Sequence, residues 1–130
     1  MSEKQTILLV DHQRTIRNIL TRELQPSYDV LFAEDGVQAI RIYERHAHEI
    51  ASLVIDVRLP RLNGRAVTEW VHHIFPNLPV IIMSRALDAE VQEMLASPAV
   101  TFLRKPFRLS ELKKVLRELV SSQMVASAAS

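Results

Sequence analysis

The chain alternates short apolar runs with longer stretches in which apolar residues recur every three or four positions. The runs cover residues 7–10, 28–32, 52–56, 80–83 and 100–103, and each has the length of a β-strand. Enough residues for one helix lie between consecutive runs. This alternation predicts an α/β fold in which a five-stranded parallel sheet is flanked by five helices.

The amphipathic stretches predict helices over residues 14–24, 37–47, 64–74, 88–95 and 110–120. Asp88 and Ser110 are expected to be the N-caps of the last two helices. We expect the apolar stripes to face the core, which makes Trp70 a core residue rather than a binding residue. The residues expected to point inward include Ile16, Ile19, Leu20 and Leu24 in the first helix and Ala66, Val67, Trp70, Val71 and Ile74 in the third.

Length and composition predict one domain. The chain has 130 residues, which is enough for one core without metals or disulfides. We expect that domain to cover residues 1–120. The small and polar residues 121–130 lose the apolar period, so we expect a flexible tail or linker there. The absence of cysteine excludes a disulfide framework and a thiolate metal site.

The N-terminus and the charge balance narrow the class of protein further. The first residues are charged and precede only a short apolar run, which predicts neither a signal peptide nor a membrane span. We therefore expect a cytoplasmic protein. The formal net charge of +1 gives no basic surface for tracking phosphates, so no direct contact with nucleic acid is expected.

Polar or charged residues follow four of the five runs. Asp11, Asp56, Ser84 and Lys105 come at the ends of the first, third, fourth and fifth runs. In a parallel sheet the carboxyl ends of the strands carry the functional site. We therefore expect these four side chains to meet there. Asp56, whose turn is closed by a proline and a glycine, is typical of a nucleophile at a strand tip.

Four motifs, each at the end of an expected strand, resemble those of the response-regulator receiver domain of two-component signalling. They are Ile-Leu-Leu-Val-Asp at 7–11, Leu-Val-Ile-Asp-Val-Arg-Leu-Pro at 53–60 with Gly64, Pro-Val-Ile-Ile-Met-Ser at 79–84 and Phe-Leu-Arg-Lys-Pro-Phe at 102–107. The resemblance extends roughly from residue 6 to residue 120. It implies the flavodoxin-like doubly wound fold of receivers. A generic doubly wound domain is the alternative.

The resemblance implies a role for each motif residue. Asp56 would accept a phosphoryl group from a histidine kinase or phosphotransfer protein, while Ser84 and Lys105 would sense that group. Phe102 would be the switch aromatic, with core packing as its competing interpretation. For the others the alternatives are a turn or N-cap aspartate, a serine that ends a strand and a solvated loop lysine.

The metal site is where the chain departs from the pattern. Receivers usually carry two adjacent acids after the first strand, whereas this chain has Asp11 and His12. The resemblance implies Mg²⁺ or Mn²⁺ held by Asp11, Asp56 and the backbone carbonyl of Arg58. Imidazole suits softer metals than Mg²⁺, so we expect weakened Mg²⁺ affinity. Arginines at 14, 58, 61 and 85 are expected to ring the cleft, or else to point to solvent.

His12 has three readings: a ligand for Mn²⁺ or Zn²⁺, a group that titrates near neutral pH, or a polar surface residue. The other histidines, at 46, 48, 72 and 73, lack the i, i+4 spacing of helical metal ligands, so they are expected at the surface.

Three functions therefore remain open. The first is a phosphorylatable receiver that switches a protein-interaction face made by the segments 88–95, 100–103 and 110–120, through which it could also form a homodimer. The second is a pseudo-receiver that docks or dimerises without phosphorylation, for which His12 argues. The third is an enzyme. Arg58 occupies the position where haloacid-dehalogenase phosphatases place a second aspartate, so we expect no enzymatic activity beyond self-phosphorylation and autodephosphorylation.

Overall fold

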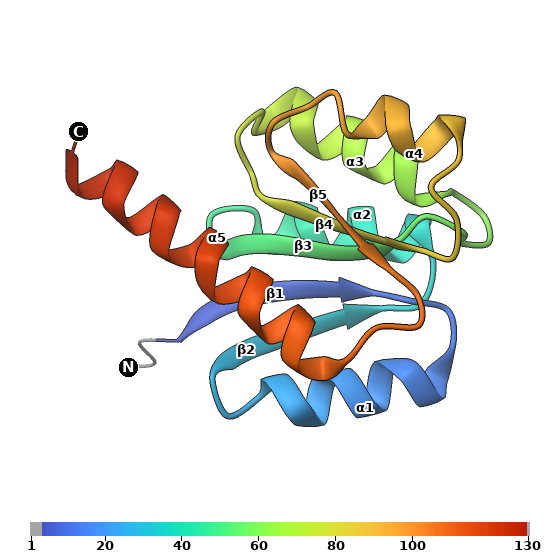
Figure 1. Cartoon of the computed structure of the whole chain (residues 1–130), viewed down its shortest axis with the longest axis horizontal. Helices are drawn as coiled ribbons and strands as arrows, with labels where there is room; N and C mark the ends of the chain where they lie inside the picture. The colour runs from blue at the N-terminus through green and yellow to red at the C-terminus, as the bar shows by residue number, and fades with distance from the viewer. Residues whose placement is uncertain (1–3, 130) are drawn as a thin grey trace.

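The computed structural model describes residues 4–129 and, from residue 120 on, the backbone only. Within that range, five parallel strands form a sheet in the order β2-β1-β3-β4-β5 (Figure 1). The strands are β1 (Gln5–Val10), β2 (Tyr28–Ala33), β3 (Ile50–Asp56), β4 (Val80–Ser84) and β5 (Val100–Arg104). This arrangement confirms the predicted parallel sheet.

One helix follows each strand, and the helices cover both faces of the sheet (Figure 1). α1 and α5 lie along one face, and α2, α3 and α4 lie along the other. The helices are α1 (Arg14–Leu24), α2 (Gly36–His46), α3 (Gly64–Ile74), α4 (Ala89–Met94) and α5 (Leu109–Ala129). Three of them begin at an N-cap whose side chain accepts a backbone N–H, namely Asp35, Asn63 and Asp88.

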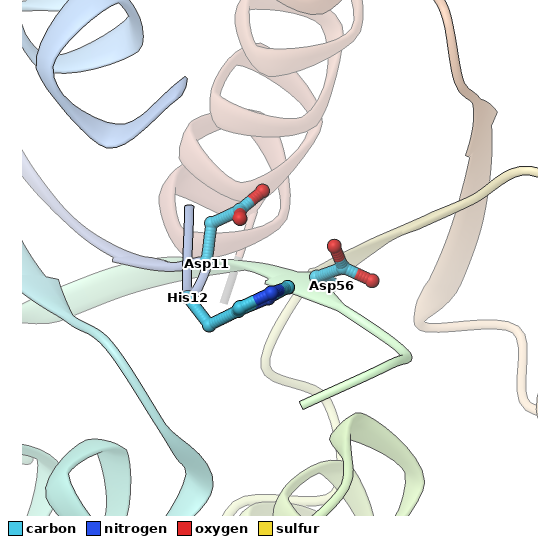
Figure 2. A group of neighbouring side chains, drawn as sticks. All are labelled: Asp11, His12 and Asp56. Atoms are coloured by element: carbon cyan, nitrogen blue, oxygen red, sulfur yellow. The ribbon is translucent and has the colours of Figure 1, made fainter. Parts of the chain in front are cut away.

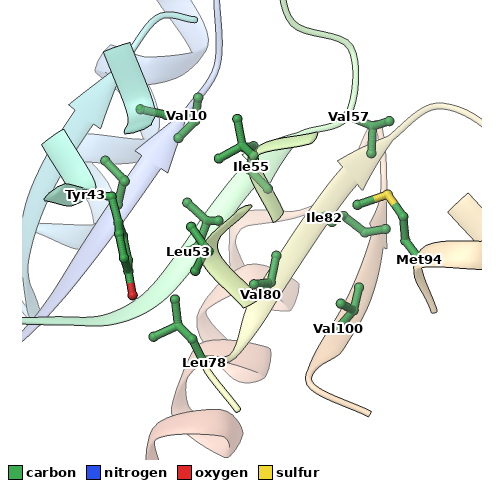
Figure 3. Packing of buried hydrophobic residues seen from close by; sticks show 14 of the residues in the cluster. Val10, Tyr43, Leu53, Ile55, Val57, Leu78, Val80, Ile82, Met94 and Val100 are labelled. Carbon is green, nitrogen blue, oxygen red and sulfur yellow. The ribbon is translucent and has the colours of Figure 1, made fainter. Parts of the chain in front are cut away.

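The two cores follow from the alternation of side chains along the buried strands. In β1, Ile7 and Leu9 pack against α1 and α5, whereas Leu8 and Val10 pack toward α2, α3 and α4. Figure 3 shows the second of these cores, in which strand residues such as Ile55 and Ile82 meet helix residues such as Tyr43 and Met94. Because both faces are covered, each central strand contains a continuous buried apolar run, at 7–10 in β1, 53–55 in β3 and 80–83 in β4.

Trp70 packs against this core, as predicted, and its ring lies edge-on to Tyr43 with the centroids 5.9 Å apart. Two other expectations about helix faces were wrong. Ile19 and Ile74 were expected to point inward, but they are 45% and 48% exposed. Each lies at the margin of its apolar stripe, where the helical period alone does not separate the buried side from the exposed one.

The ends of α5 also differ from the prediction. The helix begins at Leu109, so Ser110 lies inside it rather than capping it, and the backbone N–H of Arg108 donates to the carboxylate of Glu111 at 3.2 Å. At the other end, the helix continues to Ala129 where the sequence predicted a flexible tail. Alanine, methionine and glutamine in this segment are strong helix formers, so the loss of an apolar period did not end the helix. The division at residue 120 into domain and linker stays a prediction.

No helix among the described residues combines the length and the apolar character that a membrane span requires.

Candidate functional site

The strand order brings the carboxyl ends of β1, β3, β4 and β5 to one edge of the sheet. β1 is paired with β2 on one side and with β3 on the other, so the order of connections reverses beside β1. A crevice outside the strand ends at such a reversal is where doubly wound sheets bind ligands. The residues expected to meet, Asp11, Asp56, Ser84 and Lys105, all lie at this edge.

Lys105 is the cation at the centre of the site. Its Nζ donates to Asp56 Oδ2 at 2.6 Å and to Asp11 Oδ2 at 2.9 Å. The carboxylates are almost completely buried, at 7% and 0% exposed for the two residues, and the lysine side chain is 15% exposed. The peptide bond between Lys105 and Pro106 is cis. One ammonium therefore compensates part of the charge of two buried carboxylates.

The same contacts set the ionisation of Lys105. Burial by itself disfavours the charged ammonium and lowers the pKa of Lys105, but the hydrogen bonds and charges of Asp56 and Asp11 outweigh burial. The pKa of Lys105 therefore lies above its ordinary value. At neutral pH this side chain is a fixed positive charge rather than a proton carrier.

Backbone N–H groups hold the second oxygen of each carboxylate. Asp11 Oδ1 accepts from the N–H of Gln13 at 2.9 Å, and Asp56 Oδ1 accepts from the N–H of Arg58 at 2.9 Å. Each turn thus fixes the carboxylate that begins it. A carboxylate oxygen has two lone pairs, so every oxygen in the pair keeps capacity for one more partner.

Gly64 lets the loop after β3 close tightly behind Asp56. Its N–H donates to the carbonyl of Val57 at 2.9 Å. A Cβ atom at this position would lie 2.4 Å from the backbone oxygen of Asp56 and 2.8 Å from Cα of Val57. No side chain fits that space, which explains why glycine follows the Asn63 cap at the start of α3.

Ser84 stands at the end of β4 on the wall of a pocket of about 400 Å³ that also contains Asp56 and Lys105. The serine is 3% exposed, and its Oγ accepts from the N–H of Ala86 at 3.4 Å. Its hydroxyl hydrogen has no acceptor among these contacts, so it is available to an oxygen placed in the pocket. His12, Gln13, Arg58 and Arg85 complete the wall with Ala86.

The expected ring of arginines forms only in part. Arg58 and Arg85 line the pocket, and Arg58 reaches across its rim to form an ion pair with Asp88 at 3.2 Å. Arg61 instead forms an ion pair with Asp35 at the start of α2, at 3.5 Å. Arg14 is exposed and does not line the pocket. The mouth of the pocket is therefore cationic at Arg85, whereas the charge of Arg58 is compensated by Asp88.

Sequence reasoning missed Arg17. This α1 residue is 8% exposed, and its guanidinium donates to the backbone carbonyl of Asp11 at 2.9 Å. It ties the first helix to the loop that carries Asp11. A signal was present, because Arg17 lies three and seven residues before Leu20 and Leu24 and therefore on the buried side of α1. It was missed because long charged side chains usually reach solvent, as the exposed Arg14 does.

Phe102 is half-buried in β5 and packs against the core shared with α4. This position agrees with the packing interpretation and leaves its role as a switch residue a prediction.

Asp11, His12 and Asp56 form the one group of metal-ligating side chains found among the described residues. One ligand atom from each lies within 4.8 Å of the others, and Figure 2 shows the imidazole of His12 directed toward Asp56. The two carboxylates suit Mg²⁺, but the imidazole does not, because Mg²⁺ prefers oxygen ligands in near-octahedral geometry. The donor set as a whole therefore does not fit Mg²⁺. A role for the backbone carbonyl of Arg58 stays a prediction.

The remaining histidines form no such group in the part of the chain that the structure describes. His48 and His73 are exposed, as expected. His46 lies 3.2 Å from the carboxylate of Glu49, and His72 lies 2.9 Å from the carbonyl oxygen of Leu78.

Known proteins share both the sequence and the fold. A family model described as the response regulator receiver domain matches residues 7–117. The response regulator MprA of Mycobacterium leprae (strain TN) is 35% identical over 117 residues, which cover 88% of this chain and 50% of MprA. The sensor kinase CckA of Brucella abortus (strain 2308) is 31% identical over 125 residues, covering 95% of this chain and 13% of the kinase.

Solved structures agree. The chemotaxis protein CheY4 of Vibrio cholerae superimposes with a TM-score of 0.80 at 26% identity, covering 89% of this chain and 98% of CheY4. A receiver domain from the hybrid histidine kinase CckA gives a TM-score of 0.75 at 28% identity and covers 88% of this chain and 97% of that one. The chain spans about half the length of the MprA proteins that it matches.

Proposed function

Because this chain belongs to the response regulator receiver domain family of two-component signalling, we propose that it accepts a phosphoryl group on Asp56 and switches a protein-interaction face in response. The observation that carries the proposal is the contact of Lys105 Nζ with Asp56 Oδ2 at 2.6 Å, beside the Ser84 hydroxyl, in a pocket open to solvent.

The proposed transfer is a displacement at phosphorus. A carboxylate oxygen of Asp56 forms the new P–O bond while the P–N bond of a phosphohistidine breaks, and the nitrogen keeps the electron pair. The product is an acyl phosphate. The lone pairs that Asp56 has not committed to Lys105 or to Arg58 supply the attacking electrons. The fixed ammonium of Lys105 stabilises the charge on the transferred oxygens, as does the Ser84 hydroxyl.

The proposed switch uses the segments that join the site to the surface. Ser84 ends β4, and Lys105 follows β5, which is paired with β4. A phosphoryl group that binds both side chains would therefore shift the ends of these two strands. Phe102 lies on β5, half-buried, and packs against the core. The face formed by α4, β5 and α5 would then contact partners or a second copy of the chain.

The proposed partners follow from the same role. A sensor histidine kinase or a phosphotransfer protein would supply the phosphoryl group. No enzymatic activity beyond self-phosphorylation from a small donor and autodephosphorylation is proposed. We place this reaction in the cytoplasm, where such donors act.

A second function is favoured by His12. Receiver domains generally bind Mg²⁺ through acidic residues, and here an imidazole stands beside Asp11. A chain that has lost efficient phosphotransfer in this way would serve as a pseudo-receiver, a docking or dimerisation module that works without phosphorylation.

Incubation with acetyl phosphate separates the two functions. We expect one phosphoryl increment in the intact mass of the full chain, mapped to Asp56 and removed by hydroxylamine, with Mg²⁺, Mn²⁺ and EDTA compared in parallel. Asp56→Asn should abolish the increment. The control Asp35→Asn keeps an N-cap acceptor on α2, outside the pocket, and should retain it.

Persistence of the increment in Asp56→Asn would remove Asp56 as acceptor. No increment with any of the metals, and none with a phosphorylated histidine donor, would overturn the phosphoacceptor function in favour of the docking module.

A further inference from the structure

We propose that Asp11, His12 and Asp56 bind a divalent cation of the later transition series, of the Co²⁺ and Zn²⁺ class, in preference to Mg²⁺. A role of this cation in phosphotransfer rests on the function proposed above. The binding of the cation itself rests only on the geometry of the three side chains.

The first step is placement. One ligand atom from each of the three residues lies within 4.8 Å of the other two. Ligands about 2.0–2.2 Å from one ion lie at most about 4.4 Å apart, so the 4.8 Å limit on the three atoms is close to the separations that a shared ion requires, and His12 is exposed and therefore able to adjust. Figure 2 shows that ring already turned toward Asp56.

The second step is the availability of the donors. All four oxygens of Asp11 and Asp56 already accept one hydrogen bond, from Lys105 or from the backbone of Gln13 or Arg58. Each oxygen has a second lone pair, so a cation can bind one oxygen of each carboxylate without displacing those donors. The hydrogen bonds also orient the carboxylates, as supporting contacts do in metal sites.

The third step is charge. Two carboxylates and the ammonium of Lys105 leave a net charge of about −1 at the site, and Arg85 adds positive charge at its mouth, where Arg58 is paired with Asp88. Mg²⁺ gives up its water reluctantly and depends on anionic oxygen ligands. With an imidazole in place of a further acid, the site offers Mg²⁺ less attraction than three carboxylates would.

The fourth step is the chemistry of imidazole. Nitrogen ligands favour Co²⁺, Ni²⁺ and Zn²⁺ over Mg²⁺ and, to a smaller degree, over Mn²⁺. A neutral histidine beside two carboxylates resembles the mixed nitrogen and oxygen sets that hold such ions, with positions left for water or a phosphoryl oxygen. The residue that weakens the site for Mg²⁺ is thus the one that selects another metal.

The test is equilibrium binding of Co²⁺ to the untagged full chain, followed by the visible ligand-field absorption, without any phosphodonor. We expect one site per chain, displaced by stoichiometric Zn²⁺ and not by a tenfold excess of Mg²⁺. His12→Asp should raise Mg²⁺ affinity and lower the ratio of Co²⁺ affinity to Mg²⁺ affinity roughly tenfold or more. His73→Gln, which removes an exposed histidine outside the site, should leave both affinities unchanged.

Three results would overturn the proposal: displacement of Co²⁺ by equimolar Mg²⁺, unchanged affinities in His12→Asp with a native circular dichroism spectrum, or loss of Co²⁺ binding in His73→Gln. Because no phosphodonor is present, this experiment is independent of the acetyl phosphate experiment. A chain that binds Co²⁺ but takes up no phosphoryl group would sink the proposed function and leave the metal site intact. A chain that is phosphorylated but prefers Mg²⁺ would do the reverse.

Discussion

The ammonium of Lys105 and the carboxylate of Asp56 lie 2.6 Å apart although the two residues are 49 positions apart in the chain. Lys105 follows β5, and Asp56 is the last residue of β3. These two strands are not neighbours, because β4 lies between them. The contact therefore spans the end of β4, where Ser84 stands. The pair makes a site only when three strands have assembled in the right order.

Replacing Lys105 by methionine should reduce the free energy of unfolding by about 2–4 kcal/mol, because it leaves the buried carboxylates of Asp11 and Asp56 without their cation. Urea unfolding at pH 7 measures the change. Lys113→Met is the matched control, since Lys113 and its partner Glu23 are each 43% exposed. That variant should lose no more than about 0.5 kcal/mol. Equal losses in the two variants would contradict the importance of the buried pair.

Stability should fall at alkaline pH. The pKa of Lys105 is raised because contacts with the two carboxylates outweigh burial, and burial raises the pKa values of Tyr28 and Tyr43. A group whose pKa is higher in the folded state contributes stability below its unfolded pKa and loses it as the pH rises through the folded pKa. The unfolded values are 10.5 for lysine and 10.0 for tyrosine.

These three groups should therefore not lower the urea midpoint between pH 7 and 9, and the midpoint should decrease above about pH 10. Lys105→Met should flatten part of that decrease. A midpoint that rises above pH 10 would contradict the direction of all three shifts.

Tyr43→Phe should leave the free energy of unfolding unchanged or raise it by up to about 1 kcal/mol. The ring is 1% exposed and packs edge-on against Trp70 and Phe75, while its hydroxyl has no hydrogen-bond partner. Phenylalanine keeps the ring and removes the unpaired oxygen. Thermal unfolding measures the effect, with Tyr43→Ala as the comparison that should cost about 3–5 kcal/mol. A large loss in Tyr43→Phe would mean that the hydroxyl has a partner, such as a buried water.

Gly64→Ala should cost about 1–3 kcal/mol and slow phosphorylation, because the added Cβ would push against the backbone of Asp56 and Val57. The rate of adduct formation with acetyl phosphate and the urea midpoint report the two effects. Asn63→Ser keeps an N-cap on α3 and should change stability by only a few tenths of a kcal/mol. Normal rates and stability in Gly64→Ala would show that the loop can shift freely.

The sequence was most informative where burial imposes a pattern. The apolar runs located the strands, and the polar residues after them located Asp11, Asp56, Ser84 and Lys105, because strand ends in a parallel sheet share one edge. Residue type alone predicted the cap Asp88 correctly, but the same reasoning was wrong for Ser110, which lies inside α5.

It was least informative where a side chain has several directions open to it. The reach of Arg58 to Asp88 and of Arg61 to Asp35 depends on long rotamers, and the position of Arg17 depends on which face of α1 meets the sheet. The sequence placed Asp11 and Lys105 at the same edge, but it did not predict that Lys105 contacts Asp11 as well as Asp56, because that contact depends on the strand order.

β5 is an edge strand, hydrogen-bonded to β4 alone. Edge elements open locally at lower cost than central ones, so the strand that leads to Lys105 can loosen while β1 and β3 hold their carboxylates in place. A partner that bound along β5 would thereby change the position of Lys105 relative to the two carboxylates. The rate of amide hydrogen exchange in β5 would then change when a group binds in the pocket at Asp56.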